Sequence, residues 1–327
     1  MHQVKKYEFV LTAETPIAHH AEVFGNHAVI MRRKVRLPGG TWAQVPIVTG
    51  DTMRHQVREA AAYAFLDAAG MLDKGALTES ALRLLFNGGM VTGRGDAANI
   101  KIDAYREMVD LIPTLGLLGG CASNRVIPGR LICEDALLIC EESVHLVPEW
   151  ARQVAGALDT ARAHIEIAQR VRMDSTLDPG KRKLLAEGDV RQLEAKDRRR
   201  ESAAESDDAV EADKSKSSMM PRTFEAIAAG SFFYWRVTCL CQSELDVDTF
   251  HTMVGTMLGN ARVGGKRGTG HGLLRAVAAQ GIVVNRPSDV TTPIDALAFA
   301  PQVGEMFRSH VRARADRARK FLSEVDS

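Results

Sequence analysis

The stretch that decides the fold is residues 231–279, SFFYWRVTCLCQSELDVDTFHTMVGTMLGNARVGGKRGTGHGLLRAVAA. Its first part alternates apolar and polar side chains, which predicts a strand over 231–242. Apolar residues then recur at helical spacing and predict a helix over 247–260. A second strand is expected over 272–279. The stretch therefore predicts a β-α-β unit whose helix and last strand are joined by a glycine-rich loop.

A second unit of the same kind is expected in the first half of the chain. Apolar and polar residues alternate over 7–17 and predict a half-buried strand. A helix over 50–68 follows, and a strand over 130–140 completes the unit. The expected helix caps are Asp51 or Thr52 in this unit and Asp246 or Asp248 in the later one. Two such units in tandem predict an α+β fold with a ferredoxin-like, RNA-recognition-motif-like core.

The remaining segments have different characters. Residues 70–124 contain helical patterns and a glycine stretch, Gly116–Gly120, which we expect to be flexible. Residues 174–218 are charged and poor in apolar side chains, so they cannot form a core of their own, and 200–218 is a candidate disordered linker. The tail, 306–325, has the pattern of a basic amphipathic helix.

The glycine-rich loop is the most informative motif. It follows a helix and precedes a strand, which is the reverse of a dinucleotide-binding loop, and it lacks the spacing of a P-loop. Glycines allow the backbone to approach a polyanion, and successive N–H groups can then form an anion-binding nest. The alternative is a tight turn with solvated basic side chains. The candidate phosphate-binding residues here are Gly264, Gly265, Lys266, Arg267, Gly268, Gly270 and His271.

A second candidate phosphate site is the start of the helix expected over 50–68. Gly50 precedes the helix, and a helix N-terminus is a natural anion site. Arg54 and Arg58 are four residues apart, so they share one helix face and can reach one backbone. Taken alone this signal is weak, because many helices carry exposed arginines.

Composition excludes some classes and leaves others open. The formal charge is +1, so a basic surface must come from local segregation of charge. The five cysteines show no metal-ligand spacing, and Cys239 and Cys241 are expected to be buried and reduced. No signal peptide or long apolar run is recognised, which predicts a cytoplasmic protein without a membrane segment. No cofactor-binding or metal-binding pattern is found.

The order of these motifs resembles the RAMP superfamily of CRISPR proteins, and in particular its Cas-seven effector backbone branch. The first motif reads PIVTGDTMRHQVR at 46–58 and the late loop reads VGGKRGTGHG at 263–272. Two further pieces fit that branch, GLLGGCASNRVIPGRL at 116–131 and MPRTFEAIAAGSFFYW at 220–235. The type IV effector backbone is the most similar variant.

The resemblance implies a division of the chain. Residues 1–69, 125–165 and 223–285 would form the RAMP palm core, 70–124 a helical insertion (a finger or lid), 166–222 a thumb with a flexible charged segment, and 286–327 a C-terminal helical tail. It also implies guide RNA, further copies of the chain, other effector subunits, and a target DNA or RNA paired to the guide as partners. The thumb would add five RNA-binding residues: Arg170, Arg172, Met219, Met220 and Arg222.

The resemblance further implies that the chain does not cut RNA. In type III relatives a catalytic aspartate lies in the loop after the first strand, and Asn26 occupies the matching position here. A neutral amide cannot act as a carboxylate ligand or base. Two alternatives stay open. One is a guide-processing endoribonuclease that uses a histidine as general acid or base, with His19, His20, His27 and His271 as candidates. The other is a ferredoxin-like protein–protein module or an unrelated enzyme.

Overall fold

The structure is a computed structural model that describes residues 3–73, 75, 77–89, 98–99, 102–122, 125–173, 186, 188–192, 194–195, 219–283, 292–294 and 304–324. The chain divides into two compact units. The larger, here the main unit, contains Met1–Ala21, Ile30–Glu166 and Ala226–Ser327. The smaller unit contains Glu22–Val29 and Ile167–Glu225.

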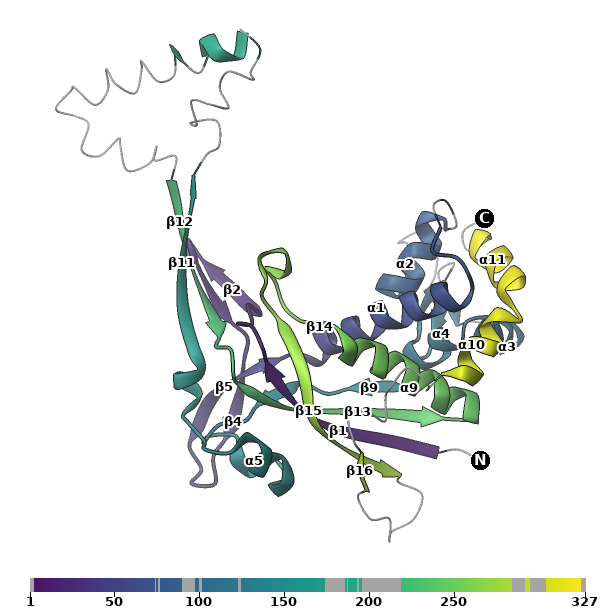
Figure 1. The fold of residues 1–327 in the computed structure, drawn as a ribbon, viewed down its shortest axis with the longest axis horizontal. Coiled ribbons are helices and arrows are strands. Elements are labelled where there is room, and N and C mark those ends of the chain that lie inside the picture. Colours follow the sequence, from purple (N-terminus) through teal and green to yellow (C-terminus); the bar gives the residue numbers. More distant parts are fainter. Residues whose placement is uncertain are drawn as a thin grey trace, which may run out of the picture. The chain divides into compact units, whose positions relative to one another are not determined.

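A curled antiparallel sheet organises the main unit (Figure 1). Its strand order is β14-β15-β1-β13-β10-β5-β4, with β16 beside β15 and β9 beside β13. The strands are β1 (Gln3–Ala13), β4 (Arg32–Arg36), β5 (Trp42–Val48), β9 (Leu131–Cys133), β10 (Ala136–Leu138), β13 (Phe232–Cys241), β14 (Ala261–Arg262), β15 (Leu273–Val283) and β16 (Thr292–Ile294).

Strand β1 lies in the interior of this sheet, and its second half is buried on both faces. Its neighbours are β13 on one side and β15 on the other. Phe9 and Leu11 belong to the main core, while Val10 belongs to a second cluster on the opposite face with residues of α5 (Glu149–Ala155). A strand is present, but the expectation that it spans 7–17 and is buried on one face only was wrong. Segments that are distant in the sequence pack against both of its faces.

The two predicted helices are present and pack against each other beside the sheet (Figure 1). They are α1 (Gly50–Ala68) and α9 (Glu244–Gly259), and both contribute to the core that contains Phe9 and Trp235. The predicted caps were wrong. The side chain of Thr49 caps α1 and that of Ser243 caps α9, each accepting a hydrogen bond from a backbone N–H in the first turn.

Asp246, one of the expected caps, has a different partner. Its carboxylate accepts hydrogen bonds from the guanidinium of Arg130, at 2.6 and 3.2 Å, and from the backbone N–H of Gln242 at 2.7 Å. It therefore connects α9 to the turn before β9.

The predicted insertion and tail form a second core together. The insertion contains α2 (Glu79–Asn87), α3 (Ile102–Leu111), α4 (Pro113–Leu118), β6 (Ala98–Asn99) and β7 (Gly120–Ala122), and β8 (Arg125–Ile127) follows directly after it. The tail is not one helix as expected but two, α10 (Glu305–Arg312) and α11 (Ala315–Ser323). Phe307, Val311 and Leu322 of the tail are buried in one cluster with Leu84 and Leu111 of the insertion.

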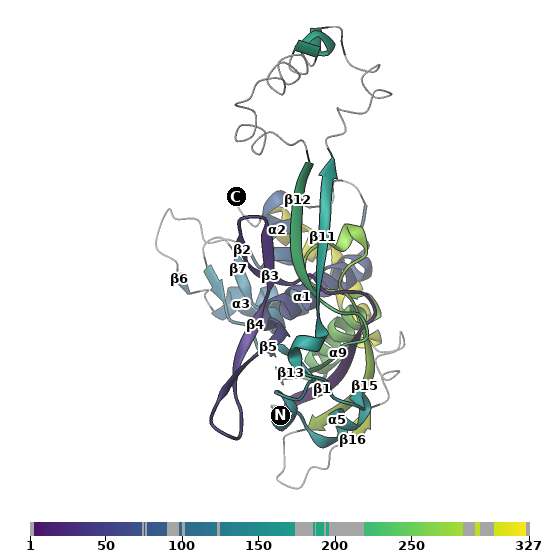
Figure 2. The same cartoon turned by 90° about the vertical axis from the view of Figure 1, so that its left-hand side faces the viewer.

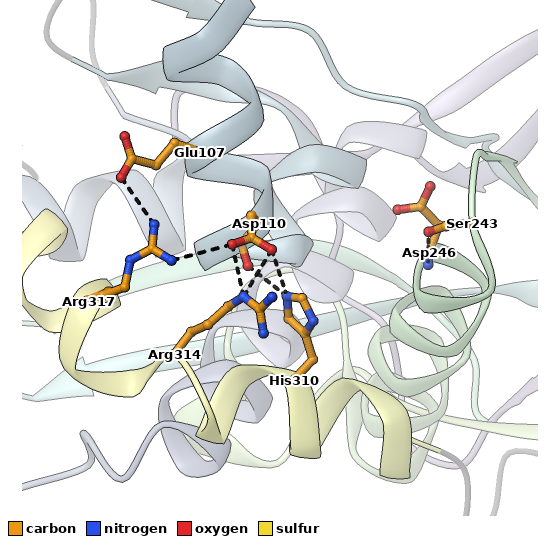
Figure 3. Close-up of polar contacts among 7 residues, drawn as sticks. All are labelled: Glu107, Asp110, Ser243, Asp246, His310, Arg314 and Arg317. Atoms are coloured by element: carbon orange, nitrogen blue, oxygen red, sulfur yellow. Dashed lines mark hydrogen bonds and ion pairs between the residues drawn. The ribbon is translucent and has the colours of Figure 1, made fainter.

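Polar contacts add to this docking of the tail (Figure 3). Asp110 at the end of α3 accepts two hydrogen bonds from Nε of Arg314, both at 2.9 Å. Its backbone oxygen accepts another from Nε2 of His310 at 2.7 Å. Arg317 reaches Glu107 at 3.3 Å. These contacts fix the tail to the insertion.

Three other expectations were wrong. Gly116–Gly120 is not a flexible stretch, because Gly116 lies in the buried helix α4 and Gly120 begins β7. The strand expected over 130–140 is broken into β9 and β10 at Glu134 and Asp135. Residues 150–163 also have a helical pattern in the sequence, but α5 ends at Ala155 and a short 3-10 turn follows at Ala161–His164.

The smaller unit is built mainly from a second sheet of order β11-β12-β3-β2 (Figure 2). Its strands are β2 (His20–Phe24), β3 (His27–Ile30), β11 (Ile165–Met173) and β12 (Met219–Ile227). The sequence pattern of residues 165–173, with apolar side chains on one side and arginines on the other, predicts a strand, and β11 confirms it. Most of the charged segment 174–218, including the candidate linker, lies outside the described residues.

Candidate nucleic-acid interface

The glycine-rich loop is held in place by the segment that leaves β1. The N–H of Gly265 donates to the carbonyl of Ala18 at 2.7 Å, and that of Gly272 donates to Pro16 at 2.9 Å. Gly264 has a φ of 75°, and a Cβ there would lie 2.7 Å from the Ala18 oxygen. Glycine is needed at this position for both backbone conformation and space.

The tip of the loop has more room. Lys266 begins a short 3-10 turn, Arg267–Thr269, and has a φ of 59°, a left-handed conformation that costs a side-chain residue about 1 kcal/mol. A Cβ at Gly268 or Gly270 would meet nothing within 4 Å. The tip is therefore accessible to a ligand, whereas the base of the loop is fixed.

An open hollow of about 490 Å³ lies between this loop, the segment after β1 and the first turns of α1. It is lined by Ala18, His19, His20, Asp51, Thr52, His55, Gly264, Gly265 and Arg267. The structure thus brings together two motifs that were predicted from the sequence, the start of α1 and the glycine-rich loop. Arg267 forms an ion pair with Glu59 at 3.3 Å, with both side chains about one third exposed.

His19 connects the wall of the hollow to the start of α1. Its Nε2 lies 3.3 Å from both the backbone N and the Oγ1 of Thr49, the cap residue of α1. Burial lowers the pKa of His19 from its ordinary value, and His20 lowers it further, while Asp135 acts in the opposite direction. His19 is therefore neutral at neutral pH and accepts the hydrogen bond from the Thr49 N–H.

The start of α1 is occupied by contacts within the protein. The N–H of Gly50 donates to Oδ1 of Asp135 at 2.7 Å, and that of Thr52 donates to Oγ1 of Thr49 at 3.4 Å. A Cβ at Gly50 would lie 2.5 Å from the carbonyl oxygen of Cys133. Gly50 thus permits close packing against the break between β9 and β10, and its N–H does not point to a ligand.

Arg54 and Arg58 also point into the protein. The guanidinium of Arg54 donates to the carbonyls of Leu131 and Leu118. Arg58 is buried and donates to Leu118 at 3.2 Å and to Gly119 at 3.0 Å. The carbonyls of Leu118 and Gly119 belong to the C-terminal end of α4, where a positive charge is favourable, and that of Leu131 belongs to β9. Burial, and then Arg54, lowers the pKa of Arg58 to about 10. The expectation that both arginines face a phosphate backbone does not agree with this geometry.

The other predicted residues are distributed as follows. His271 is 8% exposed and lies at the base of the loop. Arg170 and Arg222 are exposed on β11 and β12 of the smaller unit, and Arg170 lies over the ring of Phe224, with 5.7 Å to its centroid. Arg172, Met219 and Met220 lie in the same two strands, but their side chains are outside the described part of the structure.

Asn26 lies in the turn between β2 and β3 and is exposed. Its backbone oxygen accepts a hydrogen bond from the N–H of Thr223 at 2.9 Å. Among the residues that the structure describes, no three His, Cys, Asp or Glu side chains form a group that could hold a metal ion. In the same part of the chain no helix has the length and apolar character needed to cross a membrane.

Two contributors to this region were not predicted from the sequence, Asp135 and His55. Asp135 binds both Gly50 and, at 3.0 Å, Arg33 of β4, so it positions α1 and the sheet edge at once. His55, which was not among the predicted site residues, lines the hollow. A carboxylate that interrupts an apolar strand pattern was the available signal for Asp135.

The chain matches no protein-family model and no curated protein sequence. Among solved structures, one described as "Type IV-B CRISPR Complex" shares its fold with a TM-score of 0.51 at 15% identity, over 92% of this chain and 99% of that chain. The crystal structure of Thermofilum pendens Csc2 gives a TM-score of 0.45 at 12% identity, over 99% of this chain and 89% of that chain.

These findings first define a class, an α+β protein with a curled antiparallel sheet and helices packed against it. Within that class the chain has the fold of a chain from the type IV-B CRISPR complex. The resemblance found in the sequence is thereby confirmed at the level of the fold.

Proposed function

We propose that this protein is a guide-RNA-binding backbone subunit of a CRISPR effector ribonucleoprotein, and that it is not an enzyme. The observation that carries the proposal is the hollow beside the glycine-rich loop, in a chain whose fold matches a CRISPR complex chain along nearly its whole length. Two motifs that lie far apart in the sequence, the start of α1 and the glycine-rich loop, meet there.

The strand order supports the ferredoxin-like, RNA-recognition-motif-like core that we propose for the main unit. The path β15-β1-β13-β10 places the last strand of the second β-α-β unit beside the first strand of the first unit. In each unit a long helix, α1 or α9, connects two strands of that path. Both helices pack into one core with β1 and β13.

The tip of the loop supplies the phosphate contacts in this proposal. Lys266 keeps a left-handed backbone that glycine would adopt at lower cost, which supports a role for its side chain. Arg267 borders the hollow and forms an ion pair with Glu59, whose side chain is about one third exposed. An RNA phosphate that replaces or joins Glu59 gains a charge-assisted hydrogen bond. Such contacts read charge and shape and leave sequence recognition to guide pairing.

The finer assignments belong to the same proposal. They are oligomerisation of the chain along guide RNA, association with other effector subunits, pairing of the guide with a target DNA or RNA, a type IV system, and a cytoplasmic location. The palm, insertion, thumb and tail boundaries also remain proposed. In the thumb we keep Arg170, Arg172, Met219, Met220 and Arg222 as RNA-binding candidates.

The purified full-length chain tests the proposal when it is mixed with labelled RNA. We expect co-purified RNA of defined length, a regular series of nuclease-protected footprints, and regularly spaced particles on long RNA. Protein that carries no RNA and gives no footprint at low salt would contradict the proposal.

One observation favours a second candidate function, an endoribonuclease that processes guide RNA. His19, His20 and His55 line the same hollow, and imidazole is the side chain most often used as a general acid or base. The same experiment separates the two functions, because this candidate predicts discrete cleavage products that disappear in a His20→Ala or His55→Ala variant. Intact RNA in all variants excludes it.

A further inference from the structure

The hairpin formed by β4 and β5 is a strongly cationic surface element that the proposed RNA site does not use. Strand β4 reads RRKVR, and the sequence from Val23 to Gly50 contains no carboxylate. None of the residues that line the hollow comes from this hairpin. It forms one edge of the main sheet, since β4 pairs only with β5 in the strand order.

The two faces of the hairpin differ in character. Val35 is buried in the main core, and Arg33 on the same face is held by Asp135 at 3.0 Å. Lys34 and Arg36, on the opposite face, are exposed. His145 holds the backbone beneath them, because its Nε2 donates to the Arg36 carbonyl at 2.9 Å. The basic face is therefore presented by an anchored strand.

An aromatic side chain lies among these cations. Trp42 is directly opposite Arg36 in the strand register and is 57% exposed. The Nζ of Lys34 lies 4.8 Å from the centroid of the indole ring. Opposite residues in an antiparallel pair share a face, so Lys34, Arg36 and Trp42 form one surface. Nothing in the core requires an indole at a position this exposed.

We propose that this face, Lys34, Arg36 and Trp42, binds a single-stranded nucleic acid separately from the hollow. Its chemistry is that of single-strand binding surfaces, which combine a positive track for phosphates with an aromatic ring on which a base stacks. A base that stacks on Trp42 leaves its phosphates beside Lys34 and Arg36. Acidic protein segments would use the cations but not the exposed indole.

The test measures the affinity of the full-length chain for short labelled oligouridine and oligothymidine, together with tryptophan fluorescence. We expect quenching on binding that is lost in Trp42→Phe. Trp42→Ala should lower affinity roughly tenfold, since base stacking on an aromatic ring is worth about 1–3 kcal/mol. Trp42→Tyr should keep most of the wild-type affinity, because its ring can still stack on a base. Lys34→Ala combined with Arg36→Ala should reduce the salt slope by about 1.4, the value for two phosphate contacts on a single strand.

The matched control removes two exposed cations elsewhere, Arg83→Ala with Arg106→Ala, and should change affinity less than about twofold. Absence of Trp42 quenching, or equal effects of the hairpin and control pairs, would overturn the inference. Loss of binding only in a Lys266/Arg267 variant would also overturn it and leave the proposed function standing. Loss only in the hairpin variants would contradict the proposed site at the loop and support the hairpin.

Discussion

The start of α1 and the glycine-rich loop gave the same signal in the sequence, glycine beside basic residues, yet they have different roles in the fold. At α1 the cations Arg54 and Arg58 are turned inward to carbonyls of α4 and β9. At the loop the backbone is fixed at its base, and Lys266 and Arg267 lie at its tip. A basic residue near a glycine thus indicates a phosphate site only when its side chain does not already donate to a buried carbonyl of the protein.

The largest effect that separates the two regions is expected at Arg58. Replacing it with alanine leaves the carbonyls of Leu118 and Gly119 buried without their charged donor. We expect the free energy of unfolding to fall by about 3 kcal/mol, as for the loss of hydrogen bonds to a buried charge. Chemical denaturation measures this, with Arg83→Ala as the exposed control. A stable Arg58→Ala protein with lost RNA affinity would show instead that Arg58 contacts RNA.

Glycine substitutions test whether the base of the loop, rather than its tip, is structurally required. Gly264→Ala combines a positive φ with a Cβ 2.7 Å from the Ala18 oxygen, and we expect a loss of about 2 kcal/mol or more. Gly270→Ala has a positive φ but open space and should cost about 1 kcal/mol. Gly268→Ala has neither and should be close to neutral. Equal thermal shifts for all three would contradict a fixed base and an open tip.

Charge removal at the tip should act on binding rather than on folding. The double variant Lys266→Ala and Arg267→Ala should lower RNA affinity about tenfold for all sequences alike and reduce the salt slope by about 1.4. The Lys266–Arg267 tip is partly exposed, so stability should change by less than about 1 kcal/mol. Filter binding at several salt concentrations measures both quantities. A loss confined to particular RNA sequences would contradict backbone recognition.

Acidification should weaken the contact that joins the two regions. Burial lowers the pKa of His19, and also of His164 and His251, from the ordinary value of 6.5. Below about pH 6.5 the unfolded chain therefore binds more protons than the folded one, and stability falls as the pH drops towards the folded values. Denaturation between about pH 7 and pH 5 measures this slope. It should be smaller in His19→Gln, and stability that rises with acid would contradict the assignment.

The smallest effect is expected at Asn26, in the turn of the smaller unit. An amide supplies no carboxylate to hold a divalent metal beside a target phosphate. The assembled protein should bind a complementary target and leave it intact in Mg²⁺, and Asn26→Ala should change nothing in target integrity. Regular cleavage by the wild-type chain that Asn26→Ala abolishes would overturn this prediction.

The local sequence pattern was sufficient to predict those helices and strands that have one apolar and one polar face. The range 50–68 of α1, the strand over 231–242 within one residue at each end, and the buried free thiols Cys239 and Cys241 follow from periodicity and composition. The positions of the glycine-rich loop and of the strand after it were also predictable, because glycines indicate the loop and the apolar run that follows indicates the strand. These signals depend on neighbours a few residues apart.

Only the tertiary structure decided where the polar groups of these elements point. Arg58 donates to carbonyls that lie 60 and 61 residues away in the sequence, and Asp135 joins α1 to β4. In the tail, Arg314 donates to Asp110 of the insertion, which lies 204 residues earlier. A buried donor or acceptor must find a partner wherever the fold supplies one, and that partner has no fixed spacing in the sequence. The sequence by itself therefore determined the elements and the loop, and the packing of distant segments decided which cations remain at the surface.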